Sequence, residues 1–192
     1  MNVSRYMQRD AVTALPTAKA SSVRECMDAH GFGLLLVAEE NGTLVGFVTR
    51  ASLKSIADDE PMSRIAHKAR FAVGPDDTLE KAALILLENR LVLLPVTEED
   101  GKLIGVLTQT EVLRGLAEGL GVGKEATRLC VKTSGDKEEL RAVIGAVWEH
   151  DARLVSLTRG ENDEAILRIQ DVQDREALRE EIEKRLLARR KT

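Results

Sequence analysis

The chain has 192 residues, of which 43% are hydrophobic, 31% charged and 3% aromatic, and its formal net charge is −4 at pH 7. This size and composition are typical of a globular protein with one or two domains and a sizeable core. The few aromatic rings and the mildly acidic balance argue against a nucleic-acid partner, because such binding needs stacking rings or a basic track.

Targeting signals and cysteines indicate the compartment. The first ten residues lack the apolar stretch of a signal peptide. The longest apolar runs, such as Leu91–Val96, are too short to span a membrane. The two cysteines, Cys26 and Cys130, lie in apolar periodic segments, which favours buried thiols over a disulfide or a metal pair. These features predict a cytoplasmic protein with no membrane partner.

The chain begins with a block of strand, helix, strand, strand and helix. Its predicted elements are a strand (Val12–Leu15), a helix that stops at Gly31, two strands (Leu34–Val37 and Leu44–Val48) and a helix that begins at Thr49. Pro16 ends the first strand, because proline cannot donate to a sheet ladder. Asn41-Gly42 lies between the two apolar runs and is a strong hairpin signal.

A second block repeats the first at an offset of 59 residues, which places Pro16 on Pro75 and Thr49 on Thr108. Its elements are a strand (Phe71–Val73), a helix with Asp77 as N-cap, two strands (Leu91–Val96 and Leu103–Leu107) joined through Asp100-Gly101, and a helix that begins at Thr108. One such unit leaves an apolar sheet face uncovered, so the two repeats are expected to pack together.

The remaining third follows a glycine-rich stretch that is expected to be a flexible join, with Gly115, Gly119, Gly121 and Gly123. Its predicted elements are a strand (Arg128–Thr133), a helix (Asp136–His150), two strands (Arg153–Thr158 and Glu164–Gln170) and a helix (Asp174–Arg189). The order is again β-α-β-β-α.

The second block carries a motif that identifies a family. The motif consists of Leu93-Leu94-Pro95-Val96, Asp100-Gly101, Leu103, Gly105 and Thr108. Its order, spacing and duplication resemble a tandem CBS-domain pair, the Bateman module, over about residues 1–118. The C-terminal order resembles an ACT domain without its last strand, and the combination is similar to the acetoin-utilisation protein B family.

The resemblance implies an α+β fold with CBS repeats at residues 1–58 and 59–120, packed as a pair, and a ferredoxin-like, ACT-like domain at residues 125–192. It also implies a regulatory protein that binds an adenosine compound such as AMP, ATP or S-adenosylmethionine. Binding would shift the arrangement of a homodimer and regulate a partner protein, with no required cofactor. The loop Ser134–Lys137 lacks the Pro-Gly pair of many amino-acid-binding ACT domains, which favours a dimerisation role for that domain.

Seven residues are candidates for the adenosine site: Thr13, Thr49, Arg50, Ser52, Ala72, Thr108 and Glu111. A threonine that opens a helix places free N–H groups near a phosphate. The resemblance assigns ribose binding to a carboxylate three residues later, which is Glu111 in the second repeat but Ser52 in the first. We therefore expect the second cleft to bind ribose better. Arg50 could reach a phosphate, and Thr13 and Ala72 lie near the adenine by position.

Several of these residues are also explained by a purely structural role, without any ligand. Thr108 with Glu111 matches a capping box, and Thr49 matches a simple N-cap. The alternative function is therefore a ligand-free dimerisation scaffold for a partner protein. The histidines, His30, His67 and His150, do not have metal-ligand spacing, and no catalytic glycine motif is present, so neither a metal site nor an enzyme is expected.

Overall fold

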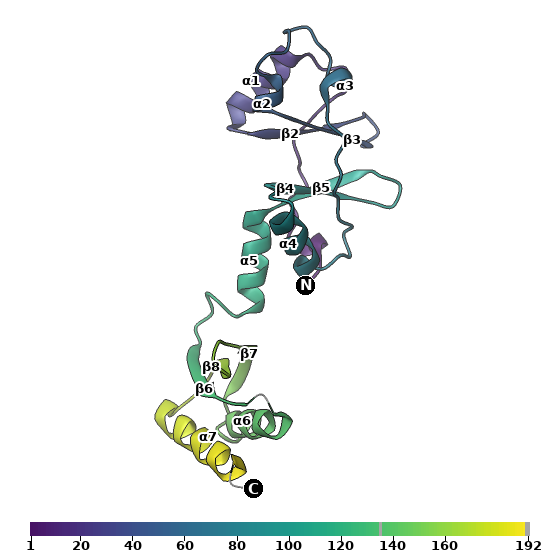
Figure 1. Ribbon diagram of the computed structural model, residues 1–192. Helices are drawn as coiled ribbons and strands as arrows, with labels where there is room; N and C mark the ends of the chain where they lie inside the picture. The colour runs from purple at the N-terminus through teal and green to yellow at the C-terminus, as the bar shows by residue number, and fades with distance from the viewer. Residues whose placement is uncertain (135, 191–192) are drawn as a thin grey trace. The chain divides into compact units, whose positions relative to one another are not determined.

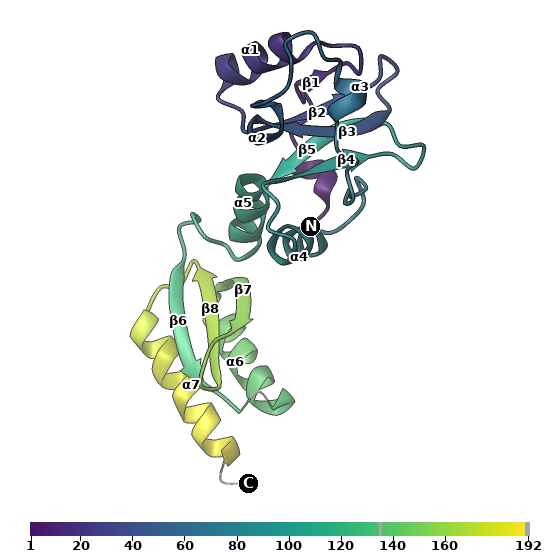
Figure 2. The same ribbon diagram turned by 45° about the horizontal axis from the view of Figure 1, so that its top comes forward.

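The computed structural model describes residues 1–134 and 136–190, and its backbone separates into two units, Met1–Gly115 and Leu116–Thr192. The first unit contains both repeats. Figures 1 and 2 show its two hairpins stacked on each other, with helices on the outer side of each. The mixed α+β class expected from the sequence is confirmed, and so is the repeated order except for the first strand of the second repeat.

The first repeat is a three-stranded sheet covered by helices. Its elements are β1 (Thr13–Ala14), α1 (Ala20–His30), β2 (Leu34–Ala38), β3 (Leu44–Thr49) and a short α2 (Arg50–Leu53). Strand β1 runs parallel to β2, and β2 is antiparallel to β3. Gly31 ends α1 with φ 69°, and Gly42 turns the hairpin with φ 87°, as the sequence predicts. The core between sheet and helices includes Val23, Met27, Val37, Val48 and Leu53.

The second repeat differs from the expected elements at its start. It consists of α4 (Leu79–Glu88), β4 (Leu93–Thr97), β5 (Leu103–Thr108) and α5 (Gln109–Gly119). The strand expected at Phe71–Val73 is reduced to a parallel bridge from Val73 to Val96. The expected N-cap, Asp77, is wrong, because the hydroxyl of Thr78 accepts the N–H of Lys81 at 3.2 Å instead. The Asp77 carboxylate accepts the N–H of Gly74 at 2.8 Å.

Each sheet is extended by the segment that leads into the other repeat. Gln8 exchanges both backbone hydrogen bonds with Val106 of β5, and His67 exchanges both with Phe47 of β3, all at 2.9 Å. These segments contain η1 (Val3–Arg5) and α3 (Met62–Ile65), which lie 59 residues apart, and Val3 and Met62 are fully buried. The duplicated unit therefore starts before its first strand, and its first segment packs on the other copy.

This exchange explains the glycine of the repeated motif. A Cβ on Gly46 would lie 2.2 Å from the carbonyl oxygen of His67, and a Cβ on Gly105 would lie 2.6 Å from that of Gln8. Because glycine has no side chain, Gly46 and Gly105 allow the backbone of His67 and of Gln8 to approach these strands closely.

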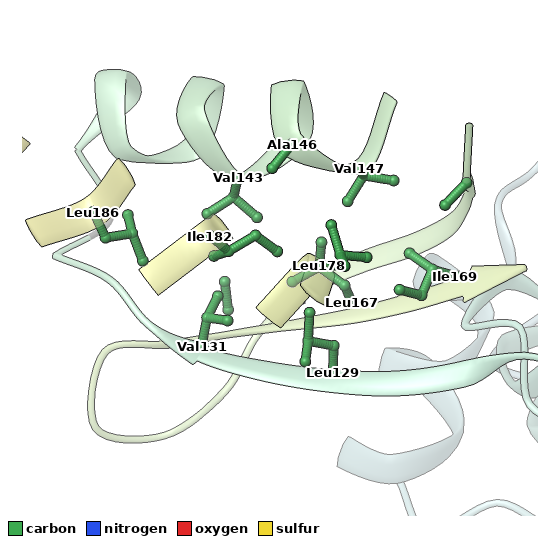
Figure 3. Packing of buried hydrophobic residues seen from close by; sticks show 12 residues of the cluster. Leu129, Val131, Val143, Ala146, Val147, Leu167, Ile169, Leu178, Ile182 and Leu186 are labelled. Atoms are coloured by element: carbon green, nitrogen blue, oxygen red, sulfur yellow. The ribbon is translucent and has the colours of Figure 1, made fainter. Parts of the chain in front are cut away.

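The C-terminal unit is an antiparallel sheet with two helices on one face. Its elements are β6 (Thr127–Lys132), α6 (Lys137–Glu149), β7 (Arg153–Arg159), β8 (Glu164–Gln170) and α7 (Arg175–Arg190), with strand order β6-β8-β7. Figure 3 shows the core between the sheet and these helices, in which Leu129, Val143, Leu167, Ile169 and Ile182 meet.

The join before β6, which the sequence predicts to be flexible, is hydrogen-bonded to this sheet. The Ser156 hydroxyl donates to the carbonyl of Leu120, and the Gln170 amide donates to that of Glu125, both at 2.8 Å. Gly121 is buried with φ 71°, and a Cβ there would lie 2.6 Å from the Val155 side chain. The join from Leu120 onward therefore belongs to the folded C-terminal unit.

Candidate functional site

The two hairpins contribute equivalent strand faces to one cleft. Cross-strand neighbours lie on the same face of a sheet. The pairs on the relevant faces are Leu34–Thr49, Leu36–Phe47, Leu93–Thr108 and Pro95–Val106. Leu34, Leu36, Phe47, Leu93 and Pro95 line a cleft of about 550 Å³. This apolar wall brings together side chains from both repeats.

Two further segments complete the cleft. The segment His67–Phe71 contributes a phenylalanine, a histidine and two cations, and the segment Asn89–Val92 adds a third cation, Arg90. The ring centroids of Phe47 and His67 are 5.8 Å apart. We call this site the cationic cleft. Its volume is within the range of small-molecule sites, and its mixture of an apolar wall with a few polar groups is typical of them.

The charged side chains of this cleft have one sign. Lys68, Arg70 and Arg90 are exposed, and no carboxylate of residues 1–134 and 136–190 forms an ion pair with any of them. No aspartate or glutamate is among the described residues that line the cleft. The chain as a whole has a net charge of −4, so this local excess of positive charge favours an anionic ligand.

The carboxylate expected to bind ribose is occupied by protein donors. Glu111 is 4% exposed, and its oxygens accept the N–H of Thr108 at 3.1 Å, the Thr108 hydroxyl, and the side-chain amide of Gln8 at 2.8 Å. Burial raises the pKa of the Glu111 carboxyl. The hydrogen bonds from the Thr108 hydroxyl and the Gln8 amide outweigh that effect, so the pKa lies below its ordinary value. Neither Thr108 nor Glu111 lines the cationic cleft.

Glu111→Gln is expected to lower the free energy of unfolding at pH 7 by about 1–3 kcal/mol, because an amide has one acceptor oxygen for these three donors. The pKa of the folded state lies below the ordinary value of 4.5, so the carboxylate stabilises fully above that value. The contribution is lost as the pH falls through the folded-state pKa, where variant and wild type should converge. Urea unfolding across this range measures the effect, with exposed Glu88→Gln as control. Equal stability of Glu111→Gln and wild type at pH 7 would contradict the prediction.

The candidates in the first repeat also bind neighbouring protein groups. Thr49 and Ser52 form a reciprocal capping box, with N–H to hydroxyl distances of 2.9 and 3.0 Å. The Arg50 guanidinium pairs with Asp28 and donates to the carbonyls of Met27 and Phe32, both at 2.7 Å. Arg50 thus donates hydrogen bonds to carbonyl groups at the C-terminal end of α1, where cations are favourable.

The two candidates for the adenine line separate hollows, although Thr13 is the cross-strand neighbour of Leu36 and Ala72 follows Phe71, two residues of the cationic cleft. Thr13 lines a hollow of about 230 Å³ beside α1, with Ser22, Val23 and Cys26. Ala72 lines an acidic hollow with Asp76, Asp77, Glu98 and Glu99. The structure therefore distributes the seven candidates over several places.

Sequence reasoning missed the cations of the cleft, although the repeat contains a signal for them. At an offset of 59 residues, Arg70 corresponds to Ala11 and Arg90 to Gly31, whereas Lys68 corresponds to Arg9. Arg9 donates to the carbonyl of Ser4 at 3.1 Å. The second copy has thus gained cations where the first has small residues, and a comparison of differences between the copies would have found them.

The described parts of the chain contain neither a membrane-spanning helix nor a metal cluster. Over residues 1–134 and 136–190, no helix is long and apolar enough to cross a bilayer. The same residues contain no group of three or more His, Cys, Asp or Glu side chains that could hold a metal ion.

The sequence has recognisable relatives. The protein MK0525 from Methanopyrus kandleri is 26% identical over 121 residues, which is 59% of this chain and 62% of that protein. Inosine-5'-monophosphate dehydrogenase from Methanocaldococcus jannaschii is 25% identical over 158 residues, which is 80% of this chain and 32% of that enzyme. The chain thus spans less than two thirds of the length of these relatives.

Solved structures share the fold of about three fifths of this chain, and several of them contain adenosine compounds. CBSX2 in complex with AMP is 26% identical, with a TM-score of 0.55 over 61% of this chain and 96% of that one. An acetoin utilization protein (AcuB) from Vibrio cholerae is 22% identical, with a TM-score of 0.58 over 66% and 98%. The CBS domain pair of MJ0100, in complex with 5'-methylthioadenosine and S-adenosyl-L-methionine, is 16% identical, with a TM-score of 0.53 over 62% and 97%.

The family itself is shown by the sequence model of the CBS domain. It matches residues 3–59 and 62–118, which together are more than half of the chain. The two matches start 59 residues apart, as do η1 and α3, so the sequence repeat and the structural repeat coincide. This chain belongs to the CBS-domain family and carries two CBS domains in tandem.

Proposed function

We propose that this tandem CBS pair is a non-enzymatic regulatory sensor that binds an adenosine compound in the cationic cleft. One observation carries the proposal: an apolar wall from both repeats lies beside three cations that form no ion pair within residues 1–134 and 136–190. An adenine ring can pack against Leu34, Leu36 and Pro95, while Lys68, Arg70 and Arg90 can hold an anionic group. The complex of CBSX2 with AMP, at 26% identity, supports the ligand class.

This site differs from the one that the motif favours. Thr13, Thr49 and Thr108 remain candidates, because they are the cross-strand neighbours of Leu36, Leu34 and Leu93 at the wall of the cleft. We assign Arg50, Ser52 and Glu111 a stabilising role, because their side chains are already hydrogen-bonded within the protein. The cations supply the charge that a phosphate requires.

Ligand binding is expected to raise the unfolding temperature of the full chain. An adenosine compound at about 100 times its dissociation constant should stabilise the folded state by about 2.7 kcal/mol. Arg70→Ala should weaken binding about tenfold, because it removes a charge-assisted hydrogen bond. Thermal unfolding with AMP, ATP and S-adenosylmethionine, followed by calorimetric titration, measures both effects.

The matched control is Lys54→Ala, which removes an exposed cation that does not line the cleft. Its affinity should equal that of wild type. The absence of a shift with all three compounds at millimolar concentration would contradict the proposed function.

We further propose that the chain forms a homodimer through the outer helices of the second repeat. Leu84, Leu87 and Leu113 are 55%, 73% and 70% exposed, and the equivalent positions in the first repeat are Glu25, Asp28 and Lys54. Helix α5 has 11 residues, whereas its counterpart α2 has four. Exposed leucines on two adjoining helices are typical of an association surface. A ligand would act on such a dimer only if its affinity differed between the dimer arrangements.

Leu113→Glu is expected to weaken dimerisation by at least about tenfold, because a charge would be buried in an apolar contact. Sedimentation analysis over a concentration series measures the dimer constant. Lys54→Glu changes the equivalent position of the first repeat and should leave the constant unchanged. A dimer that is insensitive to Leu113→Glu would exclude this surface.

A ligand-free scaffold is the second candidate function. It is supported by the capping box of Thr49 with Ser52 and by the hydrogen bonds of Thr108 to Glu111 and Thr110, which are all formed without a ligand. A scaffold would retain dimerisation and partner binding in the absence of nucleotide, and Arg70→Ala would change neither.

We propose domain limits of residues 1–58 and 59–120 for the CBS repeats and 125–192 for an ACT-like domain. The support for the last is the β-α-β-β-α order, the strand order β6-β8-β7, and two helices on one face. These features are those of a ferredoxin-like sheet without its fourth strand. In this proposal the domain contributes to dimerisation, and the whole protein acts in the cytoplasm.

A further inference from the structure

We infer that the cationic cleft selects nucleoside polyphosphates by charge, and that the ribose hydroxyls contribute little to recognition. This inference rests on the proposed function, because it names the ligand class of the same site. It predicts weak binding of two kinds of adenosine compound: those that have no phosphate group, and those that have a positively charged group.

The first feature of the cleft is the position of its cations. Lys68 and Arg70 lie on a short segment whose two ends are held by different sheets. At one end, His67 is bonded in both directions to Phe47 of the first repeat. At the other end, the N–H of Val73 donates to the carbonyl of Pro95 in the second repeat at 3.1 Å. With both ends anchored, the backbone that carries the two cations is held near the apolar wall, which reduces the backbone entropy lost when a ligand binds.

The third cation comes from a different element. Arg90 follows α4 and has φ 53°, a left-handed conformation that is uncommon for residues other than glycine. The backbone on both sides is fixed, since the N–H of Arg90 donates to Leu87 and that of Leu91 to Leu86, at 3.3 and 2.9 Å. Arg90 therefore approaches the cleft from a second direction. Cations from two segments suit an extended anion with several charged groups better than a single phosphate.

The second feature of the cleft is that none of its described lining residues is a carboxylate that could accept hydrogen bonds from both hydroxyls of a ribose diol. Glu111, the carboxylate expected to hold ribose, is buried and bonded to Gln8 and Thr108. A ligand thus finds cationic donors for its phosphates but no carboxylate for its hydroxyls.

These two features of the cleft set the expected order of ligand affinities. S-Adenosylmethionine has a sulfonium and an ammonium group, so the cations of the cleft repel it. Adenosine can only use the apolar wall. Each additional phosphate adds a negative charge that the cations can neutralise. Removal of the ribose 2'-hydroxyl removes a group that has no charged partner in the cleft.

The test is calorimetric titration of the full chain with ATP, 2'-deoxy-ATP, AMP, adenosine and S-adenosylmethionine at low salt. We expect ATP and 2'-deoxy-ATP to agree within about threefold, and AMP to bind about tenfold more weakly than ATP. Adenosine and S-adenosylmethionine should be weaker than ATP by about a hundredfold. The affinity for ATP should fall as the salt concentration rises, because exposed charges are screened.

Charge variants separate this inference from an unspecific effect. Arg70→Glu should reduce the difference between ATP and adenosine at least about tenfold, whereas Lys54→Glu makes the same charge change outside the cleft and should preserve it. If no adenosine compound binds, the proposed function itself fails. If adenosine or S-adenosylmethionine binds as tightly as ATP, or if 2'-deoxy-ATP binds tenfold or more weakly than ATP, the proposed function stands and this inference is overturned.

Discussion

Gly46→Ala is expected to lower the free energy of unfolding by about 3 kcal/mol, which is a large part of the stability of an ordinary domain. The new Cβ would lie 2.2 Å from the carbonyl oxygen of His67 and 2.9 Å from its carbonyl carbon. Its neighbour is backbone, so no side chain can rotate away. The backbone of His67 is in turn held by two hydrogen bonds to Phe47. Relief of the clash would break these bonds and detach the exchanged segment from the first repeat.

Urea unfolding of Gly46→Ala measures this loss of stability, and Gly33→Ala is the control variant. Gly33 is exposed, has no heavy atom within 4 Å of an added Cβ, and does not have a positive φ. The control should therefore change the free energy of unfolding by less than about 0.5 kcal/mol. If both variants were as stable as wild type, the exchange of segments between the repeats would be contradicted, because an open edge at Gly46 would accept a methyl group.

Leu167→Ala is expected to destabilise the C-terminal unit by about 3 kcal/mol. Leu167 is fully buried on β8, the central strand, and packs with Leu129, Val143 and Leu178 between the sheet and the two helices (Figure 3). Truncation leaves a cavity that these neighbours cannot close without moving a strand or helix. The unfolding transition of this unit should shift to lower temperature, while the first unit keeps its own transition.

The control for this variant is Leu187→Ala on α7. Leu187 is 58% exposed, so its removal should change the free energy of unfolding by less than about 0.5 kcal/mol. Calorimetry of both variants, with and without ATP, separates the two units. If Leu167→Ala lowered the transition that ATP stabilises, the two units would unfold as one, which would contradict their independence.

Local signals in the sequence were sufficient for most of the secondary structure. The strand expected at Glu164–Gln170 is β8, and the helix expected at Asp136–His150 is α6 together with its two capping residues. Asn41-Gly42 turns the hairpin of β2 and β3, where the N–H of Thr43 donates to the Asn41 side chain at 2.9 Å. These features depend on neighbours within a few residues of each other, which is why pattern and turn chemistry predicted them.

The candidate site was predicted less well, because its residues come from distant parts of the chain. The motif directed attention to Thr108 and Glu111, but the partner that closes this carboxylate, Gln8, lies 103 residues away. Arg50 is likewise engaged by Asp28, on the helix that precedes its hairpin. A pattern shows that a side chain can bind a ligand, but not whether another segment already occupies it.

Short segments and their recurrence after 59 residues were enough to establish the tandem repeat, most of its order of elements, the hairpin turns and the family. The pairing of segments across the repeats, the need for glycine at position 46 and the positive charge around the cleft became visible only in three dimensions. The physical reason is that backbone pairing at a sheet edge depends on position in space and imposes few requirements on side chains. Lys68, Arg70 and Arg90 share no motif and become one site only when the two hairpins pack together.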